Sequence, residues 1–149
     1  MPRTVPAPPR RGGRRRLLVG ITVAAVAAGC GSGRSPADPD TIARGQEIYE
    51  ASCVGCHGGP TGGEINEIPP RHNAEGHTWH HGDCVLEEII REGPAPRPEA
   101  PQDFPTMPAF GDELSDDDIA AVLAYIRTWW TEEQRDFQDE RTREDCAGE

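Results

Sequence analysis

The sequence predicts a small all-α domain of about three to four helices. Three stretches carry apolar side chains at helical spacing, and each begins or ends at a recognisable signal. The segments between them are punctuated by glycine and proline, which is typical of loops. The predicted helices are residues 40–52, 83–91 and 115–130.

The chain begins with a segment typical of an export signal. Residues 1–29 contain six arginines and no acid, and an uninterrupted apolar run extends from Leu17 to Ala28. A helix of that length rises only about 18 Å, whereas a bilayer core is roughly 30 Å thick. We therefore expect residues 1–29 to be a signal peptide that takes no part in the fold.

A stretch rich in glycine, serine and proline, residues 30–39, separates this segment from the first predicted helix. It has no periodicity and is typical of a flexible tether. Asp40 or Thr41 is expected to cap the helix that follows. The helical spacing places four residues on one face: Ile42, Gly45, Ile48 and Tyr49.

The middle of the chain contains one short helix between two loops. Residues 58–78 form a loop, and residues 83–91 form a helix that stops at Gly93, which is followed by proline. Residues 94–108 contain six prolines, so we expect an irregular, stiffened segment. The apolar residues of the short helix are Val85, Leu86, Ile89 and Ile90.

The last predicted helix has the clearest start signal. Ser115 precedes it, and Asp118 stands three positions later as a capping-box partner. Residues 131–149 are highly charged and are expected to extend this helix or to fray as a C-terminal tail. The apolar face of the helix is Ile119, Val122, Leu123 and Ile126, and the helix is expected to end around Trp129 and Trp130.

The chain is strongly acidic once the export segment is set aside. After residue 29 there are nine arginines, no lysine and 26 acids, a formal net charge of −17. Nucleic acid and anionic lipid head groups would repel such a chain. The charge suits redox partners with a basic docking face, where it would set the association rate more than the affinity. The alternative is that the acidity only keeps an exported protein soluble.

The chain is also poor in material for a core. Only 35% of its residues are apolar and 5% aromatic. A domain this small and this polar struggles to bury enough apolar surface by itself. The composition therefore indicates that another group fills its interior.

One pentapeptide, Cys-Val-Gly-Cys-His from Cys53 to His57, matches the c-type haem attachment signature. The thiols of Cys53 and Cys56 can each add to one haem vinyl group, and His57 then lies beneath the iron as its proximal ligand. A zinc site is one alternative, but it needs four ligands and the chain has no second C-x-x-C. A thioredoxin-like redox pair is another, but its βαβ context is absent.

A second iron ligand is expected at Met107. Met1 is removed with the signal peptide, so Met107 is the methionine that remains. It lies on a loop that prolines restrain on both sides. A thioether ligand favours ferrous iron and raises the reduction potential. The alternative is a methionine that only fills the core.

At this point the chain resembles the small bacterial class I cytochromes c, over about residues 40–130. The resemblance implies the class I cytochrome c fold, all-α, wrapped round one covalently bound haem c. It also implies that the first and last helices cross at Gly45 and that a carbonyl of Pro69 or Pro70 orients His57. The matching residues are Gly45, Tyr49, Cys53, Cys56 and His57, the stretch 76–81, Met107 to Phe110, Leu114 to Asp116 and Val122 to Ile126.

The remaining cysteines have other expected roles. Cys30 follows two alanines and a glycine and looks like the lipidated cysteine of a lipoprotein; the alternative is ordinary cleavage near Ala28 or Gly29. Cys84 and Cys146 are candidates for a disulfide in an oxidising compartment. Their sequence positions do not show whether their Cα atoms approach within about 7 Å, as a disulfide requires.

Four histidines, His72, His77, His80 and His81, flank Trp79 within ten residues. Such a cluster can hold copper or zinc. In the cytochromes that this chain resembles, the region lies near the haem edge, so a hydrogen-bonding loop is favoured over a second metal site.

These features predict a one-electron carrier with His/Met-ligated haem, exported to the periplasm or the outer face of a membrane and lipid-anchored there. No general base or nucleophile constellation is visible, so we expect an electron-transfer protein and not an enzyme, although the chain could serve as a subunit of a redox enzyme complex. A haem sensor of carbon monoxide or nitric oxide is the alternative if Met107 does not bind iron. A metal-handling role for the histidines is a third hypothesis.

Overall fold

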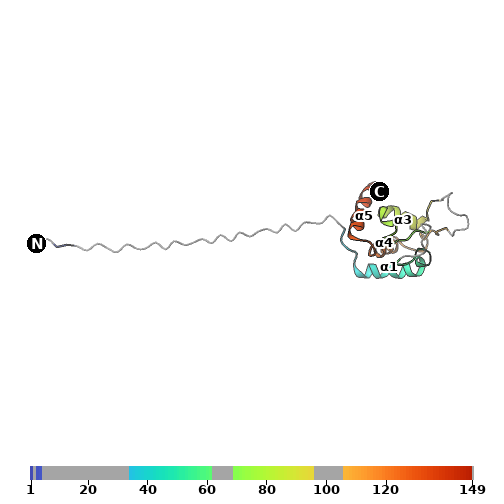
Figure 1. Ribbon diagram of the computed structural model, residues 1–149, viewed down its shortest axis with the longest axis horizontal. Coiled ribbons are helices and arrows are strands. Elements are labelled where there is room, and N and C mark those ends of the chain that lie inside the picture. The colour runs from blue at the N-terminus through green and yellow to red at the C-terminus, as the bar shows by residue number, and fades with distance from the viewer. Residues whose placement is uncertain (2, 5–33, 62–68, 96–105, 149) are drawn as a thin grey trace. The chain divides into compact units, whose positions relative to one another are not determined.

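The computed structural model describes residues 1, 3–4, 34–61, 69–95 and 106–148, and residues 32–149 belong to one compact unit. The elements are α1 (Pro39–Ser52), α2 (Val54–His57), a 3-10 helix η1 (Thr78–His80), α3 (Asp83–Glu92), α4 (Asp116–Arg127) and α5 (Glu132–Asp145) (Figure 1). The described residues contain no β-strand, so the all-α prediction is confirmed.

Several sequence predictions lie outside the described residues. These are the signal peptide, the lipidation candidate Cys30 and most of the proline-rich segment. Among the residues that are described, none belongs to a helix long and apolar enough to cross a bilayer.

The core forms where α1 crosses α4 (Figure 1). Gly45 makes the crossing possible: a Cβ atom at this position would lie 1.9 Å from the carbonyl oxygen of Ala121. The expected close approach at Gly45 is therefore confirmed. The buried core cluster consists of Ile48, Tyr49, Leu86, Val122, Leu123, Ile126 and Trp130.

The helix starts agree only in part with the sequence signals. Helix α1 is capped by Asp38 and not by Asp40 or Thr41; the Asp38 carboxylate accepts hydrogen bonds from the backbone N–H groups of both residues. Proline at position 39 has the backbone geometry of a first helical residue and lacks an N–H that would need a partner, so the helix can start there. At α4 the predicted capping box between Ser115 and Asp118 is present.

Helix α4 ends at Arg127, earlier than the apolar pattern predicts. The Thr128 hydroxyl donates to the carbonyl of Tyr125, 2.7 Å away, and the chain turns there. Trp130 therefore lies after the helix, with its side chain buried, and its indole N–H donates to the carbonyl oxygen of His72 at 2.7 Å.

Residues 131–149 are not a frayed tail or an extension of α4. They contain a separate helix, α5, which begins with a capping box between Thr131 and Gln134. Its two buried side chains, Gln138 and Asp139, are polar, so the sequence has no apolar stripe that would predict packing of α5 against the domain. Gln138 is fully buried and donates from Nε2 to the Asp83 carboxylate at 2.5 Å. Polar contacts, together with the edge-on packing of Phe137 against Trp79 and His80, thus hold α5 against the domain.

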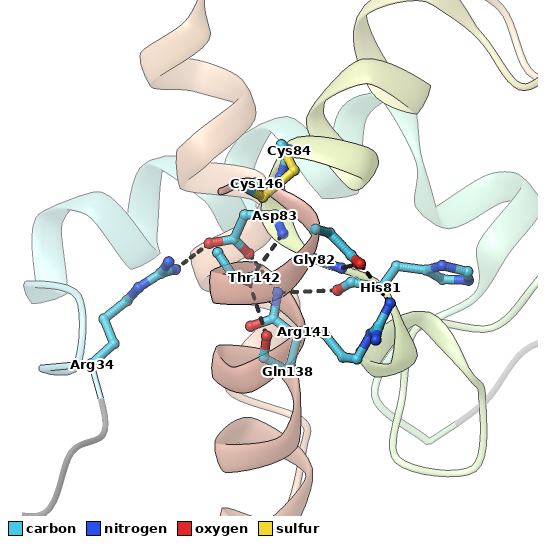
Figure 2. The surroundings of a disulfide bond; sticks show 10 residues. Arg34, His81, Gly82, Asp83, Cys84, Gln138, Arg141, Thr142 and Cys146 are labelled. Carbon is cyan, nitrogen blue, oxygen red and sulfur yellow. Dashed lines mark hydrogen bonds and ion pairs between the residues drawn. A yellow bond between two sulfur atoms is a disulfide. The ribbon is translucent and has the colours of Figure 1, made fainter. Parts of the chain in front are cut away.

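Helix α5 also caps the start of α3 (Figure 2). The N-cap residue of α3 is a glycine, which has no side chain to accept from the first N–H groups. Acceptor atoms on α5 and on the residue that follows α5 take the place of the missing N-cap side chain. The pairs are Gly82 N–H to Asp145 Oδ2 at 3.1 Å, Asp83 N–H to Thr142 Oγ1 at 3.1 Å and Cys84 N–H to Cys146 Sγ at 3.3 Å. The two helices are therefore coupled at this end.

A disulfide joins Cys84 to Cys146 at the same place, with Cα atoms 5.8 Å apart (Figure 2). This separation lies within the range that an unstrained bridge needs. The bridge spans 62 positions of the sequence and ties the end of α5 to the first turn of α3.

Residue 34, in the middle of the expected tether of residues 30–39, is bound to the same region. The Arg34 guanidinium forms an ion pair with Asp83 (Figure 2). The backbone N–H of Arg34 donates to the Asp139 carboxylate at 3.0 Å. Arg127 holds the other oxygen of Asp139 at 2.8 Å. The expected tether is therefore bound to the domain at Arg34.

Replacing both Cys84 and Cys146 by serine is expected to lower the free energy of unfolding by roughly 4 kcal/mol, because the bridge constrains a long loop in the unfolded chain. Urea titration of the variant against the wild type measures the difference. A reducing agent should destabilise the wild type and leave the double variant unchanged. Equal stability of the two proteins would contradict a native bridge.

Candidate functional site

The C-x-x-C-H pentapeptide consists of Cys53, which is the N-cap residue, and the single turn α2 (Val54–His57) that follows it. Two backbone N–H groups, of Cys56 and His57, donate to the carbonyl of Cys53 at 3.1 and 3.0 Å. Gly58 ends the turn with a φ of 71°, a conformation that L side chains rarely adopt. Both cysteines are free thiols, one half-buried at position 53 and one exposed at position 56. The turn thus presents two unpaired thiols one helical turn apart.

The His57 imidazole is held by one hydrogen bond that leaves one ring nitrogen free. Its Nδ1 lies 2.7 Å from the carbonyl oxygen of Pro70, to which it can only donate. The expected carbonyl is therefore that of Pro70 and not of Pro69. Burial lowers the pKa of His57, although the hydrogen bond to Pro70 acts in the opposite direction. A neutral ring with Nδ1–H committed to a carbonyl offers Nε2 as a metal ligand.

The ring of His72 packs directly on the ring of His57. The ring centroids are 4.2 Å apart and the planes are 28° from parallel. The Nδ1 atom of His72 lies 2.8 Å from the hydroxyl of Thr78, which donates in turn to the Arg71 carbonyl at 3.2 Å. Burial, and then the neighbouring His57 and His77, lower the pKa of His72 to about 3, so this ring is also neutral.

Met107 lies on a segment that the end of α3 positions. The backbone N–H groups of Phe110 and Gly111 donate to the carbonyls of Ile90 and Arg91, both at 3.0 Å. At Gly93 a Cβ atom would lie 3.3 Å from the carbonyl oxygen of Met107, so the two backbones run close together. The structure therefore brings Cys53, Cys56 and His57 onto one turn, whereas Met107 lies on a separate segment that is held beside the end of α3.

The other histidines of the loop contact one another and neighbouring aromatic rings. The ring centroids of His77 and His80 are 6.3 Å apart, and those of His77 and His81 are 5.7 Å apart. Within the described residues no group of three or more His, Cys, Asp or Glu side chains is arranged to hold a metal ion. His80 packs instead against Trp79, with a centroid separation of 3.7 Å. These contacts favour the interpretation as a hydrogen-bonding and packing loop.

Sequence reasoning did not single out the residues that fix this loop. Trp130 and Gln134 donate from their side chains to the carbonyls of His72 and Ala74, at 2.7 and 2.8 Å. A buried indole N–H needs an acceptor, which was the available signal at Trp130. Gln134 gave no signal because it lies on a helix without an apolar stripe.

The residues present fit a c-type haem. The donor set comprises two free thiols one turn apart and an imidazole whose Nε2 is free. Of the described residues, the buried apolar ones lie on α1, α3 and α4 and at Trp130, while Met107, the expected distal ligand, and Phe110 three residues later are half-buried. Apolar side chains of this kind suit contact with a large flat apolar ring.

Comparison with known proteins agrees with this donor set. The family profile described as "Cytochrome C oxidase, cbb3-type, subunit III" matches residues 40–126, which is more than half of the chain. The match begins near the start of α1 and ends near the end of α4, so it includes the C-x-x-C-H turn and Met107. No solved structure matches the chain significantly.

Individual relatives differ in how much of their length the chain spans. Cytochrome c-551 of Bacillus subtilis is 27% identical over 120 residues, which cover 72% of this chain and 88% of the relative. The cbb3-type cytochrome c oxidase subunit FixP of Azorhizobium caulinodans is 30% identical over 98 residues, 65% of this chain but only 30% of FixP. A nicotinate dehydrogenase subunit of Pseudomonas putida is 28% identical over 90 residues, 58% of this chain and 7% of that relative.

The chain thus spans most of one small cytochrome and small parts of two larger redox subunits. The family profile matches the segment that carries the C-x-x-C-H turn, from α1 to the end of α4. The chain belongs to the family of small c-type cytochromes that the cbb3-type subunit III profile describes: it binds one covalent c-type haem and is an electron-transfer protein.

Proposed function

We propose that the chain is a one-electron carrier in which Cys53 and Cys56 form the thioether bonds and His57 and Met107 are the axial iron ligands. The observation that carries this proposal is the His57 ring, whose Nδ1 is committed to Pro70 and whose Nε2 is free beside two unpaired thiols. The haem supplies reversible one-electron chemistry at iron.

The protein's own residues would bind the haem iron and adjust its reduction potential. The hydrogen bond from His57 to Pro70 makes the imidazole a stronger electron donor, which stabilises the ferric state. The Met107 thioether acts in the opposite direction and favours the ferrous state. If His57 and Met107 both held the iron, no open position would remain for a substrate, which would suit electron transfer and not catalysis.

The acidic composition of the chain supports the proposal that its redox partners have a basic docking face. Beyond residue 29 the formal net charge is −17. Opposite charge on a partner raises the association rate, and the effect weakens as salt screens it. FixP and the nicotinate dehydrogenase relative are by name subunits of redox enzymes, so a place beside such a complex is part of the proposal.

The arginine-rich and apolar residues 1–29 support export to the periplasm or another extracytoplasmic face of a membrane. Cys30 would carry the lipid anchor. From there only residues 31–33 separate Cys30 from Arg34, which binds Asp83 and Asp139.

The test is the native protein, made in a host that attaches c-type haem. We expect haem that stays on the chain after denaturation, a low-spin spectrum with the weak far-red band of methionine–iron bonding, and an N-terminal Cys30 with the mass of attached lipid. Rapid carbon monoxide binding by the reduced protein at neutral pH would contradict Met107 ligation and favour a sensor. A colourless, folded protein would contradict the whole proposal, and a water-soluble chain beginning elsewhere would contradict the anchor alone.

A further inference from the structure

A second histidine, which the proposed function leaves without a role, lies against the proposed proximal ligand. His72 and His57 are stacked, with centroids 4.2 Å apart and planes within 28° of parallel. The two rings come from different segments, since His57 ends the turn α2 and His72 lies two residues after Pro70. A stack between segments fixes orientation in a way that neither segment does alone.

The His72 ring is itself fixed through Nδ1. The Thr78 hydroxyl donates its one hydrogen to the Arg71 carbonyl at 3.2 Å, so toward His72 it can only accept. The contact of 2.8 Å between His72 Nδ1 and Thr78 Oγ1 therefore requires the hydrogen on Nδ1. Thr78 is 4% exposed, so water does not compete for these bonds.

The backbone of His72 is held as well. Its carbonyl accepts from the indole of Trp130 at 2.7 Å, and Trp130 is 3% exposed. The ring of Tyr49 meets the His72 ring edge-on, at a centroid distance of 6.1 Å. Side chain and main chain are thus both restrained, so His72 cannot follow a rotation of His57.

We propose that His72 is a positioning residue that sets the plane of the His57 imidazole. This inference rests on the proposed role of His57 as an iron ligand. A single hydrogen bond to Pro70 fixes one atom of the ring but permits rotation about that contact, and the stacked face of His72 removes this freedom. A fixed plane keeps the bond to Pro70 well aligned, which maintains the electron donation from His57 to the metal.

The test compares His72→Leu with the wild-type holoprotein and with His77→Leu, a control at an exposed histidine of the same loop. In the ferric protein the hyperfine-shifted haem methyl resonances report the orientation of the axial ligands. We expect His72→Leu to retain covalent low-spin haem, to change the methyl pattern and to shift the reduction equilibrium toward the ferrous form by about fivefold, or about 40 mV for one electron. His77→Leu should leave both readouts unchanged, and His72→Phe, which retains an aromatic face, should restore much of the methyl pattern.

Two results would overturn the inference. One is a wild-type methyl pattern and potential in His72→Leu, even if its thermal stability falls. If His72→Leu does not accumulate, Thr78→Val is the deciding variant, because it removes the hydrogen-bond partner of the His72 ring and keeps the ring itself. The second result that would overturn the inference is an unchanged methyl pattern in Thr78→Val. A wild-type protein without low-spin haem would instead contradict the proposed function, so the two failures are distinguishable.

Discussion

Gly45→Ala is expected to destabilise the domain by more than about 3 kcal/mol and to prevent haem-loaded protein from accumulating. The new Cβ atom would lie 1.9 Å from the carbonyl oxygen and 2.5 Å from the carbonyl carbon of Ala121. Both are backbone atoms of α4, so no side-chain rotation relieves the overlap and the two helices must separate. The better helix propensity of alanine is worth only about 1 kcal/mol, which does not offset the loss.

The matched control is Gly59→Ala, because a Cβ atom at Gly59 meets nothing within 4 Å. Urea unfolding of the two variants and the wild type measures the difference, with soluble haem-stained protein as a second readout. A Gly45→Ala protein as stable as Gly59→Ala would mean that the helix crossing is looser than the structure describes.

Met107→Ala is expected to keep the covalent haem, to lower the reduction potential and to open a ligand position. Loss of the thioether removes the interaction that favours ferrous iron, while His57 and its bond to Pro70 continue to stabilise the ferric state. We expect the reduction equilibrium to move toward the ferric form by at least about 100-fold, or about 120 mV. The reduced variant should also bind carbon monoxide rapidly, which the wild type should not do.

The matched control is Met107→His, which offers a nitrogen ligand in place of sulfur. We expect it to block carbon monoxide and yet to show the lowered potential, because imidazole does not favour ferrous iron as a thioether does. Redox titration and carbon monoxide mixing separate the two variants. A wild-type potential in Met107→Ala would show that another residue is the distal ligand.

Local signals in the sequence were sufficient where a short stretch determines its own structure. The capping box of Ser115 and Asp118 and the helical face of α4 follow from side chains a few residues apart. The same is true of the C-x-x-C-H turn, whose spacing alone places both thiols and the imidazole on one turn. The predicted cap of α1, Asp40 or Thr41, was wrong, because Asp38 is an equally competent cap and the helix begins directly after it.

The contacts that hold the site in place could not be predicted from short stretches of sequence. Helix α5 has the charge pattern of a solvated tail, and what orders it is a set of hydrogen bonds to α3 together with the bridge between Cys84 and Cys146. Partners this far apart in sequence are known only when the chain has folded. The same holds for the stack of His72 on His57.

The sequence by itself determined the all-α class, the chemistry of the thiols and imidazole at residues 53–57, and the small residue that the helix crossing needs at Gly45. The tertiary structure alone decided which carbonyl binds His57, which ring packs on it and what caps α3. The physical reason is that residue type and spacing fix bonds along the chain, whereas the direction of a ring and the partner of a buried N–H depend on groups that only folding brings together.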